Sequence, residues 1–335
     1  MLRLGYKAST EQFSPQQLIQ FAVAAEAHGF DSVFVSDHFQ PWRHTDGHAP
    51  SAIALLGALG ASTSRITIGT SVLTPTFRYH PAIVAQAFAT LGSLFPGRMI
   101  LGVGSGESLN EVPATKLSWP DNKVRFARLR EAVELIRQLW REQRVSFNGE
   151  YYQTQNATIY DRPAQPIPVY IAAAGPKIAA YAGQYGDGFI CTSGKAETLY
   201  TEQLLPQVMA GRARRPDSCE SSFENMIELK VSFNTDQHQA LQDTRHWAAL
   251  ALSPEQKMNM ADPLDLERLA AALPLEQVAS RWIVSTDPDE HVAQISRYIR
   301  LGFRHLVFHA PGNDQLRFMQ HYAEHILPRL RSGAR

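Results

Sequence analysis

Cysteine is scarce in this sequence, which contains only Cys191 and Cys219 among its 335 residues. Two cysteines cannot form a disulfide framework, and no four-ligand zinc spacing is present. The chain also lacks an apolar run of about 18 residues that would indicate a membrane span. Its first expected strand begins almost at Met1, which leaves no room for a signal peptide. From these absences we expect a cytoplasmic protein in which Cys191 is a small apolar packing residue.

The sequence also has no excess of charge of either sign. Its 32 Lys and Arg residues equal its 32 Asp and Glu residues, so the formal net charge is +0. Such a chain has no long-range field that would attract nucleic acid or an acidic membrane surface, and we expect neither as a partner. Any anionic ligand would have to be held by a local cluster of cations.

Short apolar runs alternate with longer amphipathic ones along most of the chain. Runs rich in β-branched and aromatic residues are typical of buried parallel strands. The expected strands are residues 2–8, 32–36, 66–72, 98–103, 169–173, 188–192, 227–233 and 304–309. The expected helices include residues 15–28, 81–94, 123–140, 176–185 and 287–301. This order predicts an α/β fold, a (β/α)₈ (TIM) barrel that occupies residues 1–335 as a single domain. A doubly wound sheet is the alternative, although no order-reversing crossover is evident.

Two segments interrupt this alternation, one after the fourth strand and one after the seventh. Residues 141–167 contain Asn148-Gly149 between alternating residues, which indicates a hairpin. Residues 235–284 look mostly helical, and an insertion of that length is usually functional, for example as a lid or a pocket wall.

Polar residues gather where the expected strands end, which is where barrel enzymes place their active sites. Glu11, Asp37, His38 and Glu107 each follow a strand and would converge on one mouth, where they are candidates for acid and base roles. The alternatives are a loop cap for Asp37 and an ordinary loop histidine for His38. His44 and His48 could suggest a metal, but the turn residues between them do not align the pair, and we expect no metal site.

Residues 102–106 form a glycine-rich run after the fourth expected strand. Its spacing is not that of a dinucleotide fingerprint, and no acidic residue follows at the proper distance. The run therefore indicates a close backbone approach to a flat or phosphorylated ligand. Tight packing at the barrel rim is the alternative.

Several long runs carry a family resemblance that covers nearly the whole chain. They are residues 4–9, the run Val35-Ser36-Asp37-His38-Phe39-Gln40-Pro41-Trp42-Arg43-His44, and residues 69–79, 188–195, 254–257 and 281–284. With these runs the chain resembles the coenzyme F420-dependent glucose-6-phosphate dehydrogenases of the luciferase-like monooxygenase superfamily. The resemblance implies a barrel that binds F420 at the strand ends, as a homodimer.

The resemblance also implies which residues bind the cofactor. They are Asp37, Ser71, Val72, Thr74, Ser105, Gly106, Asn110, Ala174, Gly175, Lys177 and Ile178. In this family a non-proline cis peptide lies behind the deazaflavin ring, and we expect it between Ser71 and Val72.

For the substrate, the resemblance implies glucose 6-phosphate, whose phosphate would be bound by Thr192, Lys195, Lys257 and Arg281. Three cations suit a group that carries about −1.5 to −2 charges near neutral pH. Hydride would pass from C1 of the sugar to C5 of F420, giving 6-phosphogluconolactone.

The same resemblance suggests four residues for the chemistry. His38 is the candidate base, since an imidazole titrates near about pH 6.5. Glu107 would assist at N1 of the deazaflavin, Trp42 would shape the pocket, and Glu11 would contribute electrostatically. The division of acid and base roles between His38 and Glu107 stays open.

The sequence departs from the family pattern at Ala174, Lys177, Met258 and the loop 113–118, which flank the sugar and the tail of the cofactor. These changes leave the proposed acid, base and phosphate cations intact. Three alternatives remain: another F420 or FMN enzyme of the superfamily, a metal-dependent barrel isomerase, and a non-catalytic F420-binding protein.

Overall fold

The computed structural model describes residues 1–215, 223–257 and 260–333, and its centre is a closed barrel of eight parallel strands. The strands are β1 (Arg3–Ala8), β2 (Ser32–Val35), β3 (Thr67–Thr70), β4 (Met99–Val103), β5 (Val169–Ala172), β6 (Gly188–Thr192), β7 (Glu224–Phe233) and β9 (His305–His309). Each pairs with the next, and β9 closes the ring by pairing with both β7 and β1. The predicted TIM barrel is confirmed, and the doubly wound alternative is wrong.

Strand β7 is longer than the others and pairs with strands of two sheets. Its first part pairs with β6 and β9, whereas Val231–Phe233 pairs with a short additional strand, β8 (Ile283–Ser285). Strand β8 was not predicted, because three residues are too few to show a strand period. This strand joins the end of the long insertion to the barrel.

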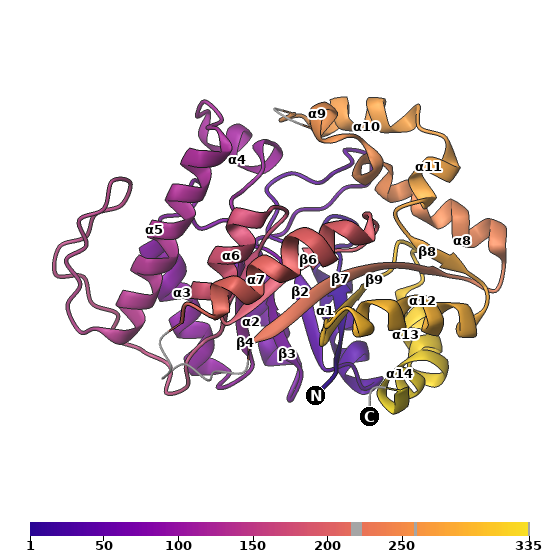
Figure 1. Ribbon diagram of the computed structural model, residues 1–335, viewed down its shortest axis with the longest axis horizontal. Coiled ribbons are helices and arrows are strands. Elements are labelled where there is room, and N and C mark those ends of the chain that lie inside the picture. The colour runs from indigo at the N-terminus through magenta and orange to yellow at the C-terminus, as the bar shows by residue number, and fades with distance from the viewer. Residues whose placement is uncertain (216–222, 258–259, 334–335) are drawn as a thin grey trace.

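Helices surround the barrel (Figure 1). They include α1 (Pro15–Ala27), α2 (Ala52–Ser62), α3 (Pro81–Leu94), α5 (Asn122–Arg141), α6 (Pro176–Tyr185), α7 (Leu205–Arg212), α12 (Pro288–Arg300), α13 (Gln315–His321) and α14 (Leu327–Gly333). Helix α1 shows how the sequence sets a boundary, because Ser14 and Gln17 form a capping box and Pro15 takes the first turn. In the described residues, no helix is long and apolar enough to cross a membrane.

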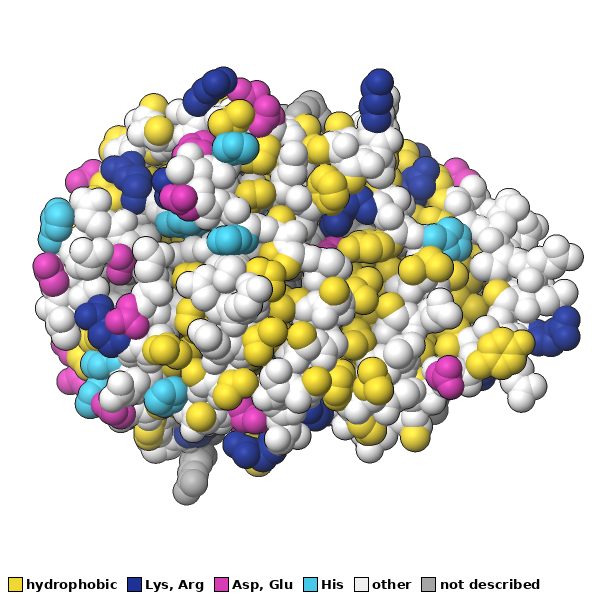
Figure 2. Space-filling model, turned by 180° about the vertical axis from the view of Figure 1, so that it is seen from behind, with side chains coloured by type: hydrophobic (Ala, Val, Ile, Leu, Met, Phe, Trp, Pro, Cys, Tyr) yellow, Lys and Arg dark blue, Asp and Glu magenta, His cyan; other side chains and the backbone are white. Residues whose placement is uncertain are grey.

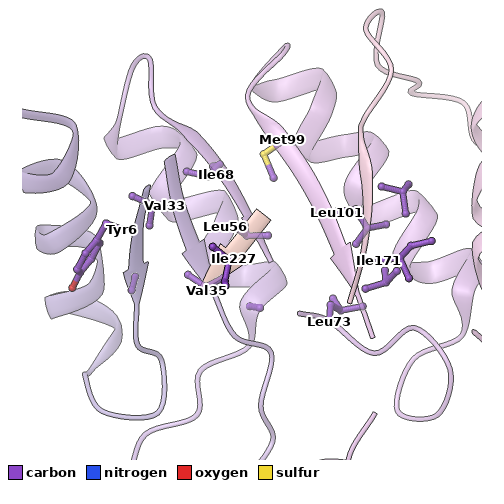
Figure 3. Packing of buried hydrophobic residues seen from close by; sticks show 14 of the residues in the cluster. Tyr6, Val33, Val35, Leu56, Ile68, Leu73, Met99, Leu101, Ile171 and Ile227 are labelled. Atoms are coloured by element: carbon purple, nitrogen blue, oxygen red, sulfur yellow. The ribbon is translucent and has the colours of Figure 1, made fainter. Parts of the chain in front are cut away.

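Two apolar layers hold the barrel together. One lies between the strands and the surrounding helices, as for Tyr6, Val33 and Ile227 (Figure 3). The other fills the barrel interior and comprises Phe34, Ile100, Tyr170, Ile190, Met226 and Val307. Because side chains alternate along a strand, residues two further on face the same interior. Along β7 these are Glu228 and Lys230, so the interior becomes polar toward the carboxyl ends of the strands.

Both long connections rise at the carboxyl end of the barrel. After β4 come α4 (Ser108–Thr115) and α5, followed by a ribbon whose antiparallel bridges join Val145 to Ala157 and Asn148 to Gln153. After β7 come α8 (Gln237–Asp243), α9 (Pro254–Lys257), α10 (Pro263–Ala271) and α11 (Leu275–Ala279). Figure 1 shows α4 and α9 to α11 at the same end of the barrel. Leu109 of α4 and residues of the second insertion share a small core, with Trp42 packed against it.

At the opposite end, Glu224 begins β7 and is held by three donors. Arg3 lies 3.1 Å from its carboxylate, the Tyr170 hydroxyl donates at 2.7 Å, and Nδ1 of His305 lies 2.9 Å away. Burial opposes ionisation of this carboxyl, but the His305 ring, Arg3 and Tyr170 together lower the pKa of Glu224 to about 2. Burial also lowers the pKa of His305, so the neutral ring acts as a donor and Arg3 supplies the lasting positive charge.

We therefore expect Glu224→Gln to lower the free energy of unfolding by about 2 kcal/mol near neutral pH. The pKa of the folded carboxyl lies below its unfolded value, so this contribution is present above the unfolded pKa of about 4.3 and is lost as the pH falls toward 2. Urea unfolding of wild type and variant at a series of pH values should show their difference shrinking on acidification. A difference that stays constant with pH would contradict the assignment.

Candidate active site

The loop after β2, which carries Asp37 and His38, is fixed by a buried ion-pair network. Arg78 Nη2 lies 2.8 Å from Asp37 Oδ2, and the other oxygen accepts from Tyr79 (3.2 Å) and the Ala52 amide (3.3 Å). Arg78 also pairs with Glu111 of α4 at 3.2 Å. Asp37 was expected to contact the cofactor and to fix the loop. Its carboxylate accepts hydrogen bonds from these protein groups, which accounts for the second role.

Asn110 of α4 holds the next residues of the same loop. Its side-chain oxygen accepts from the Phe39 amide at 2.9 Å and the Gln40 amide at 3.3 Å. Asn110, another expected cofactor contact, is thus buried against the loop. Together with Arg78 it fixes the backbone from which His38 projects.

His38 faces a buried carboxylate and an aromatic ring. Its Nε2 lies 3.4 Å from Glu11 Oε1, and its ring centroid lies 5.8 Å from that of Trp42. Burial opposes ionisation of Glu11, but His38 and Lys7 outweigh it and hold the pKa of that carboxyl below its ordinary value. Glu11 therefore stays ionised and can stabilise a positive charge on His38, as in other carboxylate–histidine pairs.

Glu107 precedes α4 on the other side of the mouth. Its side chain reaches the surface, yet the surrounding protein desolvates it, and this raises the pKa of Glu107 although His38 and Lys257 oppose the shift. The pKa values of Glu11 and Glu107 are thus shifted in opposite directions. Opposite shifts of this kind are typical of two carboxyl groups that take different roles in catalysis.

Three cations from three separate segments meet at this mouth. Lys257 Nζ and Arg281 Nη1 donate to the same acceptor, the carbonyl of Leu250, at 3.3 and 3.1 Å. Lys195 lies beside them because the preceding residue, Gly194, packs closely against Arg281. Gly194 has a φ of 74°, and a Cβ there would lie 2.4 Å from the Arg281 carbonyl oxygen. Only glycine fits that approach. Burial lowers the pKa of Lys195 and of Lys257, and the charge of Arg281 adds to both shifts.

Thr192, the fourth expected phosphate residue, ends β6, and its carbonyl accepts from the Tyr200 hydroxyl at 2.8 Å. Met258 lies outside the described residues. Among the residues that the structure describes, no group of three His, Cys, Asp or Glu side chains is placed to hold a metal ion.

The expected cofactor face begins at the peptide between Ser71 and Val72. This peptide is cis, as predicted. Lys7 Nζ donates to both the carbonyl and the hydroxyl of Ser71 at 2.7 Å. Thr74 is buried nearby and lies 3.0 Å from where a Cβ on Gly106 would stand.

At the first position of the glycine-rich run, close packing leaves room only for glycine. A Cβ on Gly102 would lie 1.9 Å from the Thr70 carbonyl oxygen, so the rim-packing alternative accounts for this position. Gly106 has a φ of 86°, which other residues rarely adopt, and Ser105 beside it is half-buried.

The start of α6 carries the remaining expected cofactor residues. Gly175 precedes the helix, and a Cβ there would meet nothing within 4 Å. Ala174 and Lys177 are exposed and Ile178 is half-buried. The amides of a first helical turn have no partners within the helix, so this end can accept an anionic group.

Sequence reasoning missed the polar layer inside the barrel. Lys7 lies 3.3 Å from Glu228, and Lys230 and His309 lie 3.9 and 3.5 Å from the same carboxylate. His309 also packs between Trp247 and Trp282, with ring centroids 4.4 and 5.0 Å away. Two lysines and a glutamate in otherwise apolar strands were the signal that could have revealed this layer.

Comparison with known proteins places the chain in a family. Residues 2–305 match the model of the luciferase-like monooxygenases. The chain belongs to the luciferase-like monooxygenase family. Within it, the F420-dependent glucose-6-phosphate dehydrogenase of Nakamurella multipartita is 62% identical over 99% of this chain and 97% of its own length. The F420-dependent glucose-6-phosphate dehydrogenase 1 of Rhodococcus jostii is 59% identical over 100% of both chains.

Two solved structures share the fold of this chain. An F420-dependent secondary alcohol dehydrogenase in complex with an F420-acetone adduct is 33% identical, with a TM-score of 0.91 over 98% of this chain and 99% of its own. The F420-dependent tetrahydromethanopterin reductase of Methanopyrus kandleri has a TM-score of 0.80 at 21% identity, over 98% and 99% of the two chains, which concerns the fold alone. The resemblance drawn from the sequence motifs is confirmed.

Removing Arg78 tests how much its ion pairs with the loop after β2 stabilise this luciferase-like barrel. Arg78→Met leaves the buried carboxylates of Asp37 and Glu111 without their partner, and we expect the free energy of unfolding to fall by about 3–5 kcal/mol. The loss should be smaller in mildly acidic solution, because burial raises the pKa of Glu111 and the carboxyl can then take up a proton.

Urea unfolding measures this loss. The matched control is Arg297→Met, whose pair with Glu197 is exposed and should contribute less than about 1 kcal/mol. Equal losses in the two variants would show that the buried network does not fix the loop.

Proposed function

We propose that this protein is an F420-dependent glucose-6-phosphate dehydrogenase, with residues 1–335 acting as one domain whose cofactor and substrate sites lie at the carboxyl ends of the strands. It would oxidise C1 of glucose 6-phosphate to 6-phosphogluconolactone and reduce F420. The observation that carries this proposal is the convergence of Lys195, Lys257 and Arg281 at the same mouth as His38. The name of the relatives at 57–62% identity supports it.

The three cations suit a phosphate for an electrostatic reason. Lys195, Lys257 and Arg281 repel one another, which contributes to the lowered pKa values of both lysines. A ligand with about two negative charges would relieve that repulsion. Arg281 can donate a fork of hydrogen bonds, while the two lysines act as point charges and Thr192 adds a hydroxyl.

The residues present also fit F420, which accepts a hydride at C5 when it is bound. The Ser71–Val72 peptide would back its ring, and Thr74, Ser105 and Gly106 would line the approach. The open start of α6, formed by Ala174, Gly175, Lys177 and Ile178, would hold the tail. Asp37 and Asn110 would support this face by fixing the loop beside it.

His38 would take the proton of the C1 hydroxyl as hydride leaves C1. Glu11, ionised and 3.4 Å away, would stabilise the imidazolium that forms. Glu107, whose pKa is raised, would lie near the ring and assist protonation at N1. Trp42 would keep water from His38, since it packs against both this ring and the small core of the insertion.

We further propose a cytoplasmic homodimer that pairs through α2 and α3. Neither helix contains a charged residue, and Ile83 and Leu94 of α3 are 56% and 62% exposed. Figure 2 shows hydrophobic side chains gathered across the face of the molecule that is turned away in Figure 1. Uncharged apolar surface of this kind favours association with a second copy.

An absorbance assay tests the activity directly. Adding glucose 6-phosphate to the enzyme and oxidised F420 should bleach the cofactor, whereas unphosphorylated glucose should not, because the cation cluster would be left without its anion. A secondary alcohol is the matched comparison, since the F420-dependent secondary alcohol dehydrogenase shares this fold at a TM-score of 0.91. Bleaching by the alcohol alone would show an alcohol dehydrogenase instead of the proposed enzyme. If neither the alcohol nor glucose 6-phosphate bleached F420, both activities would be excluded.

His38→Ala tests the proposed base. We expect kcat to fall by about 10²–10⁴-fold, the usual contribution of general base catalysis, with the affinity for F420 retained. Stopped-flow turnover and fluorescence titration of F420 would measure the two quantities. Near-normal turnover in this variant would remove His38 from the mechanism.

A further inference from the structure

Two charged residues of β7, Glu228 and Lys230, have no part in the reaction just described. Both face the barrel interior, because they follow Met226 at intervals of two residues. Glu228 pairs in register with Thr192, and the amide of Lys230 donates to the hydroxyl of Ser193 at 2.9 Å. Lys230 therefore lies at the floor of the mouth, beside the turn that leads to the phosphate cations.

The charged groups of this layer lie close together but are not evenly paired. Oε2 of Glu228 lies 3.3 Å from Lys7 Nζ, and Oε1 lies 3.9 Å from Lys230 Nζ and 3.5 Å from His309 Nδ1. Burial opposes ionisation of Glu228, but Lys7, His309 and Lys230 hold its pKa well below the ordinary value. Burial lowers the pKa of His309, which leaves the ring neutral. Lys7 also lowers the pKa of Glu11, so it is shared between two carboxylates, whereas Glu228 is the one carboxylate within 4 Å of Lys230 in the described residues.

Lys230 is the less well paired of the two lysines, because Lys7 also donates two hydrogen bonds to Ser71. The side chain of Lys230 is only 4% exposed, and within the described part of the chain its ammonium has Glu228 as its one acidic neighbour within 4 Å and donates no hydrogen bond. Burial lowers the pKa of Lys230 to about 8; Glu228 opposes this shift, whereas Arg281, Lys195 and Lys7 add to it. Burying an ammonium group whose donors have no acceptor costs free energy, so an anionic ligand that accepts from it would bind favourably.

We propose that Lys230 is a fourth cation of the phosphate site, which binds the phosphate of the substrate from the barrel floor. The inference rests on the proposed function and extends it, because the family resemblance assigns the phosphate only to Thr192, Lys195, Lys257 and Arg281. Lys230 differs from these residues in being enclosed by the barrel. A phosphate held from below as well as from the rim would fix the distance between the phosphate and C1, which favours a hexose 6-phosphate over a free phosphate.

A consequence for proton balance follows from the charges around Lys230. The titratable and charged groups that face it are Glu228 on β7, Lys7 on β1, Cys191 on β6, Lys195 after β6, Arg281 before β8 and His309 on β9. A bound dianion would hold Lys230 protonated, so binding takes up on the order of half a proton at about pH 8. Affinity for the substrate should weaken as the pH rises above that value, because the neutral amine no longer attracts the phosphate.

Lys230→Met tests the assignment by calorimetric titration of glucose 6-phosphate into the enzyme without F420. Wild type should take up a proton near pH 8, measured from the heats in buffers of different ionisation enthalpy. The variant should take up fewer protons, because only Lys195 and Lys257 can then contribute, and it should bind about tenfold or more weakly, as expected for the loss of a charged hydrogen bond. Arg331→Met is the control: it removes one positive charge that pairs with Asp31 at the other end of the barrel, and it should behave as wild type.

Two further variants keep the test decisive if Lys230→Met folds poorly, as thermal melting would reveal. Lys230→Gln keeps a hydrogen-bond donor but no charge, and should show the same smaller proton uptake. Glu228→Gln removes the charge that favours the protonated ammonium, and should move the pH at which affinity declines to a lower value. Unchanged affinity and proton uptake in the Lys230 variants, or no binding of glucose 6-phosphate to wild type, would overturn the inference. Binding with proton uptake but no reduction of F420 would contradict the proposed function and leave the inference standing.

Discussion

The pairing of β7 with three other strands is the interaction on which the site depends. Its first part closes the barrel between β6 and β9, and its last part pairs with β8, which begins two residues after Arg281. That single strand places Lys230 on the barrel floor and ties the end of the long insertion to the mouth. Arg281 and Lys257 then share the Leu250 carbonyl, so the insertion contributes two cations at a fixed position.

The two sides of the mouth differ in charge: one has a carboxylate beside His38, and the other has a cluster of cations. On one side, Glu11 stays ionised beside His38, which suits a group that must accept a proton and become positive. On the other, cations crowd together without enough carboxylates to neutralise them, which suits a dianionic ligand. A protein with no net charge can bind an anionic sugar only by such local concentration. Proton acceptance and anion binding are kept apart because their residues follow different strands of one barrel.

Much of this arrangement could be predicted from the sequence, because buried parallel strands and amphipathic helices have distinct periods. The motif runs around His38 and Lys195 identified the family and the cis peptide. The short strand β8 and the interior layer of Lys7, Glu228 and Lys230 could not be predicted, because they depend on which strands become neighbours. The network of Arg78 with Asp37 and Glu111 was also hidden, since its members lie far apart in the sequence.

The central claim is that the phosphate of glucose 6-phosphate lies among the cations while C1 faces His38. A crystal structure of the enzyme with reduced F420 and glucose 6-phosphate would test this most directly, because no turnover can occur in that complex. The account predicts the phosphate within hydrogen-bond distance of Lys195, Lys257 and Arg281, and C1 between the cofactor and His38. A phosphate bound at the start of α6, or a sugar turned with C1 away from His38, would contradict it.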